Sequence, residues 1–153
     1  MSRHDPGTTD WEGIGAGGSL YEAGYTSAAH GWSTGVLPAL TTDLLGAAPT
    51  GVGFATWSVR PHPGGVHWAR GRVPTPNGAL AVSWHRYTHR FTLRVSAPVG
   101  TSGTIAVPAA RGARVRLDGR MLHAGDAHGS RWVRGTVVIR HVGPGEHRVA
   151  VVR

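Results

Sequence analysis

The chain has 153 residues, enough for one domain of ordinary size that buries roughly 70% of the surface its extended chain exposes. It contains no cysteine, which excludes disulfides, thiolate metal sites and a cysteine nucleophile. No run approaches the ~20 apolar residues that span a bilayer, and residues 1–10 lack the apolar core of a signal peptide. We therefore expect a cytoplasmic protein with no membrane partner.

The formal net charge is +8, and all sixteen Lys and Arg residues are arginines. A basic chain can bind nucleic acid by releasing counterions from the phosphate backbone. Here most arginines are scattered between Arg60 and Arg153, and several alternate with apolar neighbours, as on the exposed face of a strand. These are Arg94, Arg114, Arg116 and Arg148. The pattern favours a solvated strand face, so nucleic acid is not the expected partner.

One helix is predicted, over Thr34 to Leu45, after a segment rich in glycine and small residues that reads as a loop. Ser33 or Thr34 can cap its start, and Gly46 is placed to end it. Five apolar residues form a stripe at helical spacing: Val36, Leu37, Leu40, Leu44 and Leu45.

Beyond Pro49 the sequence changes to short alternating runs separated by Gly and Pro, which is typical of antiparallel β-proteins. The runs 80–85 and 91–96 are predicted to form a hairpin across His85 to Arg90. Further strands are expected at Phe54–Val59, Val66–Val73, Gly103–Val107, Arg114–Leu117, Trp132–Arg140 and His147–Val152. The expected fold class is therefore mainly β, an antiparallel β-sandwich of about eight strands preceded by a glycine-rich loop and one helix.

Neither a cofactor nor a metal ion is predicted. Gly13, Gly15 and Gly18 have the spacing of a dinucleotide-binding loop, but no strand precedes them and no clear helix follows. His85 and His89 have the spacing of two zinc ligands on a helix, but in a strand that spacing separates them by ~13 Å.

Six tryptophans are many for this length. Trp57, Trp68 and Trp84 lie in strand-like runs, so core packing is the favoured interpretation for all three. Trp11 and Trp32 lie outside any periodic pattern, so a role in stacking on sugars is as plausible as packing.

Several unusual runs occur together in the first half of the chain. The first are Thr8 to Glu12, with the letters TTDWE, Gly18 to Leu20 and Tyr25 to Trp32. They are followed by Leu44–Gly46, Pro49–Gly51, Gly53–Trp57, Pro61–Gly64 and Val73–Gly78. In this order the runs resemble the C-terminal end of the bacterial α-L-rhamnosidases of glycoside hydrolase family 78, over roughly residues 8–84.

The resemblance implies a domain organisation: residues 1–48 correspond to the tail of the (α/α)6 catalytic barrel and residues 49–153 to the C-terminal β-sandwich. It also implies roles for two residues. Glu12 corresponds to the general base of inverting hydrolysis and His30 to a rhamnose contact. Trp11 and Trp32, as aromatic side chains that can stack on sugars, are the further candidates for substrate binding. The family's general acid lies far upstream, so we expect this chain to lack it.

The leading hypothesis is thus a C-terminal fragment or split part of an α-L-rhamnosidase that is inactive alone. Its partners would be a rhamnose-containing glycan or glycoside once a barrel complements it. A second copy or a separately encoded barrel could bind through Val36, Leu37, Leu40 and Leu44. The alternatives are a free-standing carbohydrate-binding β-sandwich and a basic nucleic-acid-associated protein.

Overall fold

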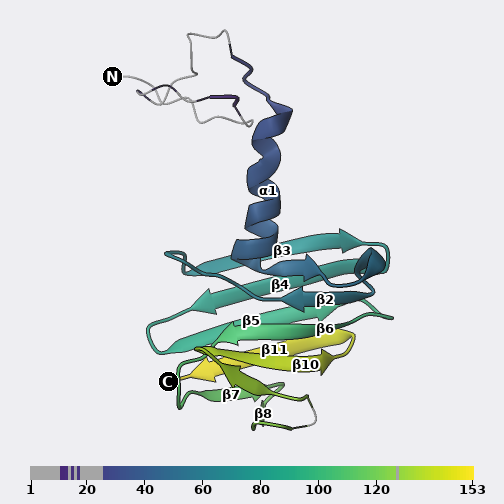
Figure 1. Cartoon of the computed structure of the whole chain (residues 1–153), viewed down its shortest axis with the longest axis vertical. Helices are drawn as coiled ribbons and strands as arrows, with labels where there is room; N and C mark the ends of the chain where they lie inside the picture. Colours follow the sequence, from purple (N-terminus) through teal and green to yellow (C-terminus); the bar gives the residue numbers. More distant parts are fainter. Residues whose placement is uncertain (1–10, 14, 16, 18–25, 127) are drawn as a thin grey trace. The chain divides into compact units, whose positions relative to one another are not determined.

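The computed structural model describes residues 11–13, 15, 17, 26–126 and 128–153 (Figure 1). The chain divides into two compact units, Met1–Ala39 and Leu40–Arg153. The division into 1–48 and 49–153 rests on the resemblance and stays a prediction. In the described part of the chain, no helix is long and apolar enough to cross a membrane.

The predicted helix is present and begins earlier than expected. A 3-10 turn at Gly31–Gly35 leads into α1 (Val36–Ala39), which continues as a π-helical turn over Leu40–Leu45. His30 occupies the N-cap position without a side-chain hydrogen bond, so the prediction that Ser33 or Thr34 caps the helix was wrong. Both hydroxyls point elsewhere: that of Thr34 donates to the Gly31 carbonyl and that of Ser33 to the Trp11 carbonyl. Gly46 ends the helix with a φ of 86°, as predicted.

The β-domain confirms the predicted sandwich. The described residues form eleven strands in two sheets (Figure 1). The five-stranded sheet has the order β1 (Ala47–Pro49), β2 (Thr56–Val59), β6 (Ser102–Pro108), β10 (Thr136–Val142) and β9 (Arg131–Val133). The six-stranded sheet has the order β3 (Trp68–Thr75), β4 (Gly78–Arg86), β5 (Arg90–Ala97), β11 (Gly145–Val152), β7 (Arg114–Leu117) and β8 (Arg120–Met121).

The strand number exceeds the predicted eight for two reasons. The short strands β1 and β8 carry too few residues to show an alternating pattern. The predicted strand Trp132–Arg140 is divided into β9 and β10 by a turn in which Arg134 and Gly135 both have positive φ, as in a tight hairpin. β4 and β5 form the predicted hairpin. Neighbouring strands are antiparallel except β2 and β6, which pair in parallel.

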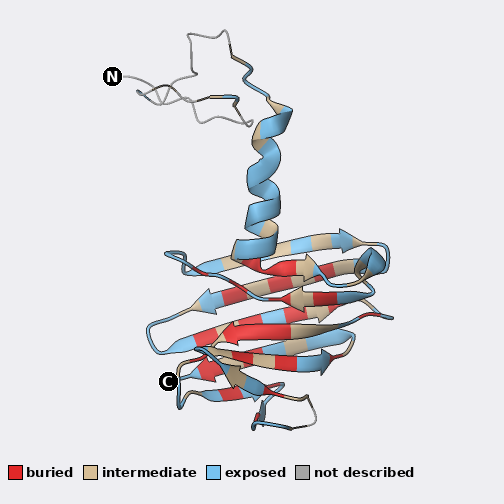
Figure 2. Cartoon of the chain, viewed as in Figure 1, coloured by how far each residue is buried: buried red, intermediate tan, exposed pale blue. Residues whose placement is uncertain are grey.

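The core lies between the two sheets, where buried residues alternate with exposed ones along each strand (Figure 2). Trp57 and Trp84 are 1% and 0% exposed, so core packing is confirmed for both. It was wrong for Trp68, whose side chain is 59% exposed. Trp68 shares its side of β3 with Arg70 and Arg72, whereas Ala69 and Val73 face the core. An inward Trp68 would bury two arginines, which costs far more than one aromatic ring contributes.

Trp57 holds β2 against β6 through packing of its side chain as well as through strand pairing. It lies opposite Gly103 in the parallel pair, and a Cβ added at Gly103 would lie 2.2 Å from the indole ring. The indole Nε1 donates to the Thr101 hydroxyl at 3.1 Å, and that hydroxyl donates to the Pro98 carbonyl at 2.8 Å. The ring therefore has its one polar atom satisfied although it is buried.

Trp84 makes the corresponding contact to the helical turn Leu40–Leu45. Its Nε1 donates to the carbonyl of Leu44 at 3.1 Å, which is one of the carbonyls that a helix end leaves without a partner. Next in the chain, Leu45 is buried and Gly46 turns into β1. A Cβ at Gly46 would lie 2.3 Å from the backbone of Arg60, so the turn accepts no side chain.

Replacing Gly103 by alanine should lower the free energy of unfolding by about 1–3 kcal/mol, because the new methyl group must displace the Trp57 ring in a packed core. Gly65→Ala is the matched control, since nothing lies within 4 Å of the Cβ it would gain. Urea unfolding of both variants measures the difference. Equal stability of the two variants would show that the contact between Gly103 and Trp57 is not tight.

Candidate functional site

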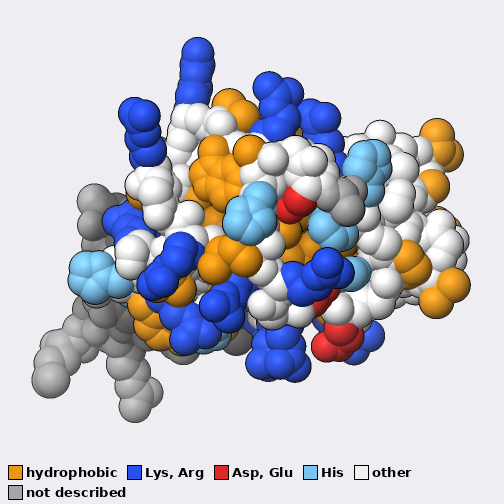
Figure 3. All heavy atoms as spheres, turned by 90° about the horizontal axis from the view of Figure 1, so that it is seen from below, with side chains coloured by type: hydrophobic (Ala, Val, Ile, Leu, Met, Phe, Trp, Pro, Cys, Tyr) orange, Lys and Arg blue, Asp and Glu red, His pale blue; other side chains and the backbone are white. Residues whose placement is uncertain are grey.

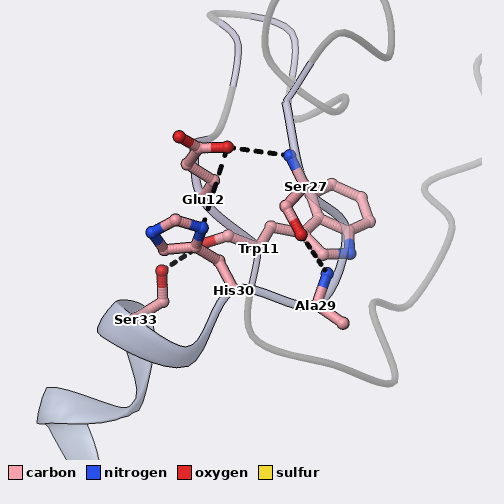
Figure 4. A network of polar contacts seen from close by, with 6 residues as sticks. All are labelled: Trp11, Glu12, Ser27, Ala29, His30 and Ser33. Carbon is pink, nitrogen blue, oxygen red and sulfur yellow. Dashed lines mark hydrogen bonds and ion pairs between the residues drawn. The ribbon is translucent and has the colours of Figure 1, made fainter.

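The site predicted from the sequence lies in the unit Met1–Ala39, and the structure brings two of its four residues together. Glu12 Oε2 accepts a hydrogen bond from the Ser27 amide at 2.8 Å and lies 3.8 Å from His30 Nδ1. The Glu12 amide donates in return to the Ser27 carbonyl at 2.9 Å. Figure 4 shows the carboxylate of Glu12 between Ser27 and His30. Glu12 is thus anchored at its backbone and at one of its carboxylate oxygens.

The contacts of His30 and Ser33 connect this pair to the start of the helix. The Ser33 amide donates to the His30 carbonyl at 3.0 Å, and its hydroxyl donates to the Trp11 carbonyl at 2.8 Å. The Ala29 amide donates to the Ser27 hydroxyl at 3.2 Å (Figure 4). Residues 11–12 and 26–33 therefore form one local network although up to 22 positions separate them.

Trp11 and Trp32, the two predicted substrate-binding tryptophans, differ in exposure and in their contacts. Trp11 is partly buried and contributes its carbonyl to the network, whereas the Trp32 side chain is 90% exposed and appears in none of these hydrogen bonds. Sequence reasoning gave Ser33 only a helix-capping role and did not single out Ser27. Ser27 lies within a run that carried the resemblance, but its contact with Glu12 spans fifteen positions and no local pattern reveals it.

The side chains of the Glu12–His30 pair remain open to solvent. Glu12 is 43% exposed and His30 is 28% exposed. The carboxylate oxygen Oε1 accepts no hydrogen bond from the residues described, so the group can still accept a proton from a bound water or hydroxyl. Gly18, the last glycine of the candidate dinucleotide loop, lies outside the described residues. No three His, Asp or Glu side chains in the described ranges gather as a metal site would require.

A second polar cluster lies in the turn between β8 and β9. The carboxylate of Asp126 accepts hydrogen bonds from the amides of His128 at 3.0 Å, Ser130 at 3.1 Å and His123 at 3.4 Å. Burial raises the pKa of Asp126, but the bonds donated by Ser130, His128 and His123 outweigh it and hold the pKa below its ordinary value of 3.8. Ser130 is wholly buried, so no substrate can reach its hydroxyl and the cluster is structural.

The comparisons with known proteins agree with the fold. Residues 46–121, from the end of the helix through β8, match the family described as the bacterial alpha-L-rhamnosidase C-terminal domain. The chain carries such a domain. A comparison with curated protein sequences finds no match. The resemblance to α-L-rhamnosidases seen in the sequence is therefore confirmed for the β-domain.

Solved α-L-rhamnosidases share this fold. The enzyme from Dictyoglumus thermophilum superposes with a TM-score of 0.81 at 23% identity, over 96% of this chain and 16% of that enzyme. The enzyme from Streptomyces avermitilis, solved with L-rhamnose, gives a TM-score of 0.71 at 27% identity, over 94% and 14%. The enzyme from Aspergillus terreus gives 0.64 at 23% identity, over 96% and 15%. The chain thus spans 14–16% of the length of these enzymes.

Asp126→Asn should destabilise the protein at neutral pH, because the two carboxylate oxygens accept three backbone hydrogen bonds, whereas the neutral amide has one acceptor oxygen and loses at least one of them. The pKa of Asp126 is lowered in the folded state, so its contribution to stability is present above 3.8 and is lost as the pH falls through the lower folded value. The difference between wild type and variant should therefore shrink in acid. Urea unfolding across this pH range measures it, and a constant difference would contradict the assignment.

Proposed function

We propose that this chain is the C-terminal part of an α-L-rhamnosidase-like glycoside hydrolase in which Glu12 is the general base. The observation that carries the proposal is the Glu12–Ser27–His30 arrangement in a chain that also carries a C-terminal domain of the rhamnosidase family. The Ser27 amide fixes one carboxylate oxygen and leaves the other open to accept a proton from an attacking water. His30 lies near enough to contact a sugar hydroxyl bound at the same place.

The proposed reaction is inverting hydrolysis of a terminal α-L-rhamnoside. An inverting glycosidase holds a carboxylate base and a carboxylic acid ~6.5–9.5 Å apart, with a water molecule between the base and the sugar. Glu12 would remove a proton from that water while the acid protonates the leaving oxygen. Among the described residues of the unit Met1–Ala39, Glu12 is the one carboxylate. The acid would therefore be supplied by a catalytic barrel that complements this chain.

On this proposal the 153-residue chain should not hydrolyse an aryl α-L-rhamnoside, because the described residues of the unit Met1–Ala39 offer Glu12 no acid partner. Release of the aryl group by the purified chain measures this. Turnover that Glu12→Gln abolishes would show that the chain is a complete catalyst and that the proposed division of the carboxylates is wrong.

Complementation with a barrel tests the proposal that Glu12 is the general base. Mixing or fusing the chain with the upstream barrel of a related α-L-rhamnosidase should restore hydrolysis, and Glu12→Gln should remove it by a factor of at least about 100, as expected for loss of a general base. Glu146→Gln is the matched control, since it removes one exposed glutamate of the β-domain. Equal loss of activity in both variants would show that Glu12 has no special role.

The helix offers a surface for such a barrel. The side chains of Val36, Leu37 and Leu40 are 48%, 55% and 45% exposed, whereas Leu44 packs against the core and Leu45 is buried. Figure 2 shows the same contrast along the helix, which is mostly coloured as exposed. Burial of each exposed side chain is worth ~1.5–3 kcal/mol, so a second copy or a barrel that covers them would stabilise the helix.

Hydrogen exchange tests this part of the proposal. In a monomeric sample the amides of Thr34 to Leu45 should exchange much faster than those of β4 and β5, and association with a barrel or a second copy should slow them. Val36→Ser with Leu40→Ser should weaken the association. Protection of these helix amides equal to that of β4 in a demonstrated monomer would contradict the proposal.

A further inference from the structure

The six-stranded sheet gathers arginines from distant parts of the sequence onto its outer face. In β3, β5, β7 and β11 the residues that point inward are buried or partly buried, so the exposed residues that alternate with them point outward. These strands carry seven outward arginines. Arg90 begins β5, and we call the other six the arginine face: Arg70, Arg72, Arg94, Arg114, Arg116 and Arg148. All six are exposed, and Glu146 is the one acidic residue at the outward positions of these strands. Figure 3 shows how far basic side chains outnumber acidic ones on the surface in view.

The strand registers arrange these side chains in rows across the sheet. Arg70 pairs with Ser83, Ser83 with Arg94, and Arg94 with Arg148, so three arginines lie on one line over four strands. Neighbouring strands are ~4.8 Å apart, which makes this line about 14 Å long. Three arginines and Glu146 border a hollow of about 510 Å³ whose floor includes Ala81 and Ser83: Arg70, Arg72 and Arg94. The small side chains leave room for a ligand between the guanidinium groups.

An aromatic row lies beside this line. The ring centroids of Trp68 and His85 are 6.3 Å apart with planes inclined by 20°, and those of His85 and Tyr87 are 6.1 Å apart with planes inclined by 14°. Trp68 and Tyr87 are 59% and 58% exposed. The three residues belong to a hollow of about 630 Å³ that also includes Arg86 and Arg90. Aromatic rings next to arginines present both an apolar surface and positive charge.

Two carboxylates of the described chain lie near the arginine face: Glu146 borders its hollow, and Asp118 accepts a hydrogen bond from the Arg148 amide at 2.6 Å. None of its arginines forms an ion pair there, since the two ion pairs of the described residues both involve histidine. Arg94 and Arg148 are direct cross-strand neighbours, and like charges in such positions repel each other. An isolated domain gains nothing from this arrangement, whereas a chain of negative charges laid across the strands would neutralise it. Arginine suits such a ligand because its planar fork can hold a carboxylate with two hydrogen bonds.

We propose that the arginine face and the aromatic row bind an acidic polysaccharide, with carboxylates on Arg70, Arg94 and Arg148 and sugar rings packed on Trp68 and Tyr87. The choice of a glycan over a nucleic acid rests on the proposed function, because the domain belongs to a family of glycosidases. The face would hold the acidic main chain of a substrate, separately from the site at Glu12.

The test uses the full chain and polygalacturonate as the probe, with a neutral galactan of similar length and a single-stranded DNA as the other ligands. Polygalacturonate should bind, more weakly as salt is added, and the neutral galactan should not. The variant Arg70→Gln/Arg94→Gln/Arg148→Gln should weaken binding about tenfold or more, as expected for three partly screened contacts. The matched control Arg111→Gln/Arg131→Gln/Arg140→Gln removes the same charge from exposed positions outside the face and should bind almost as wild type does.

A second variant, Trp68→Ala/Tyr87→Ala, separates sugar stacking from charge. It should weaken binding of polygalacturonate several-fold while thermal unfolding stays close to that of wild type, since both side chains are exposed. Absence of binding, equal loss in the two arginine variants, or tighter binding of the DNA would each overturn the proposal. Glu12→Gln should bind polygalacturonate normally. Loss of rhamnosidase complementation with intact binding, or the reverse, therefore shows which of the two proposals has failed.

Discussion

The period-two alternation of the six-stranded sheet is the constraint on which the rest of the β-domain depends. Leu80, Val82 and Trp84 of β4 point into the core, and their neighbours in β5 and β11 do the same in register. A slip by one residue would expose the apolar side of any of these strands and, in β5 and β11, would also bury arginines, so the apolar side determines the register. The same register determines which residues lie on the outer face of the sheet. Arg70, Arg94 and Arg148 lie in line because the residues beside them point inward.

Two indole rings make the contacts that hold β2 against β6 and the end of the helix against the six-stranded sheet. Trp57 fills the space above Gly103 in the parallel pair of β2 and β6, and Trp84 binds the last turn of the helix through the Leu44 carbonyl. Both rings are buried, and both satisfy their single donor. The end of the helix is therefore attached to the β-domain by a hydrogen bond and by Leu45, whereas the side chains of Val36, Leu37 and Leu40 stay exposed. The domain is built to receive a helix end rather than to cover a whole helix.

The sequence predicts what depends on neighbours in the chain. The β-sandwich, the β4–β5 hairpin and the glycine that ends the helix all follow from local alternation and turn residues. Trp68 was predicted to be buried because it is aromatic and lies in a strand-like run, but Arg70 and Arg72 share its side of the strand and already indicate that it faces outward. On the other side, Gly71 makes room for the side chain of Leu45, which a Cβ at Gly71 would approach to 2.8 Å. That contact links two segments that no local pattern connects.

The same limit explains what the sequence could not show about the two candidate sites. Arg94 and Arg148 lie 54 positions apart and become neighbours only through the register of β5 and β11, so their scatter along the chain was interpreted as a solvated face. Ser27 reaches Glu12 across a segment of fifteen positions without a periodic pattern.

Energetically the two sites differ from the core that positions them. The arginine face adds no ion pair to the described structure and sets like charges side by side, and the Glu12 network consists of a few partly exposed hydrogen bonds. Each such exposed contact contributes ~1 kcal/mol or less to stability, whereas the fold rests on two buried indoles and a closely packed interior. Substitutions at either site can therefore change binding or catalysis while the domain stays folded, so the two proposals can be separated by experiment.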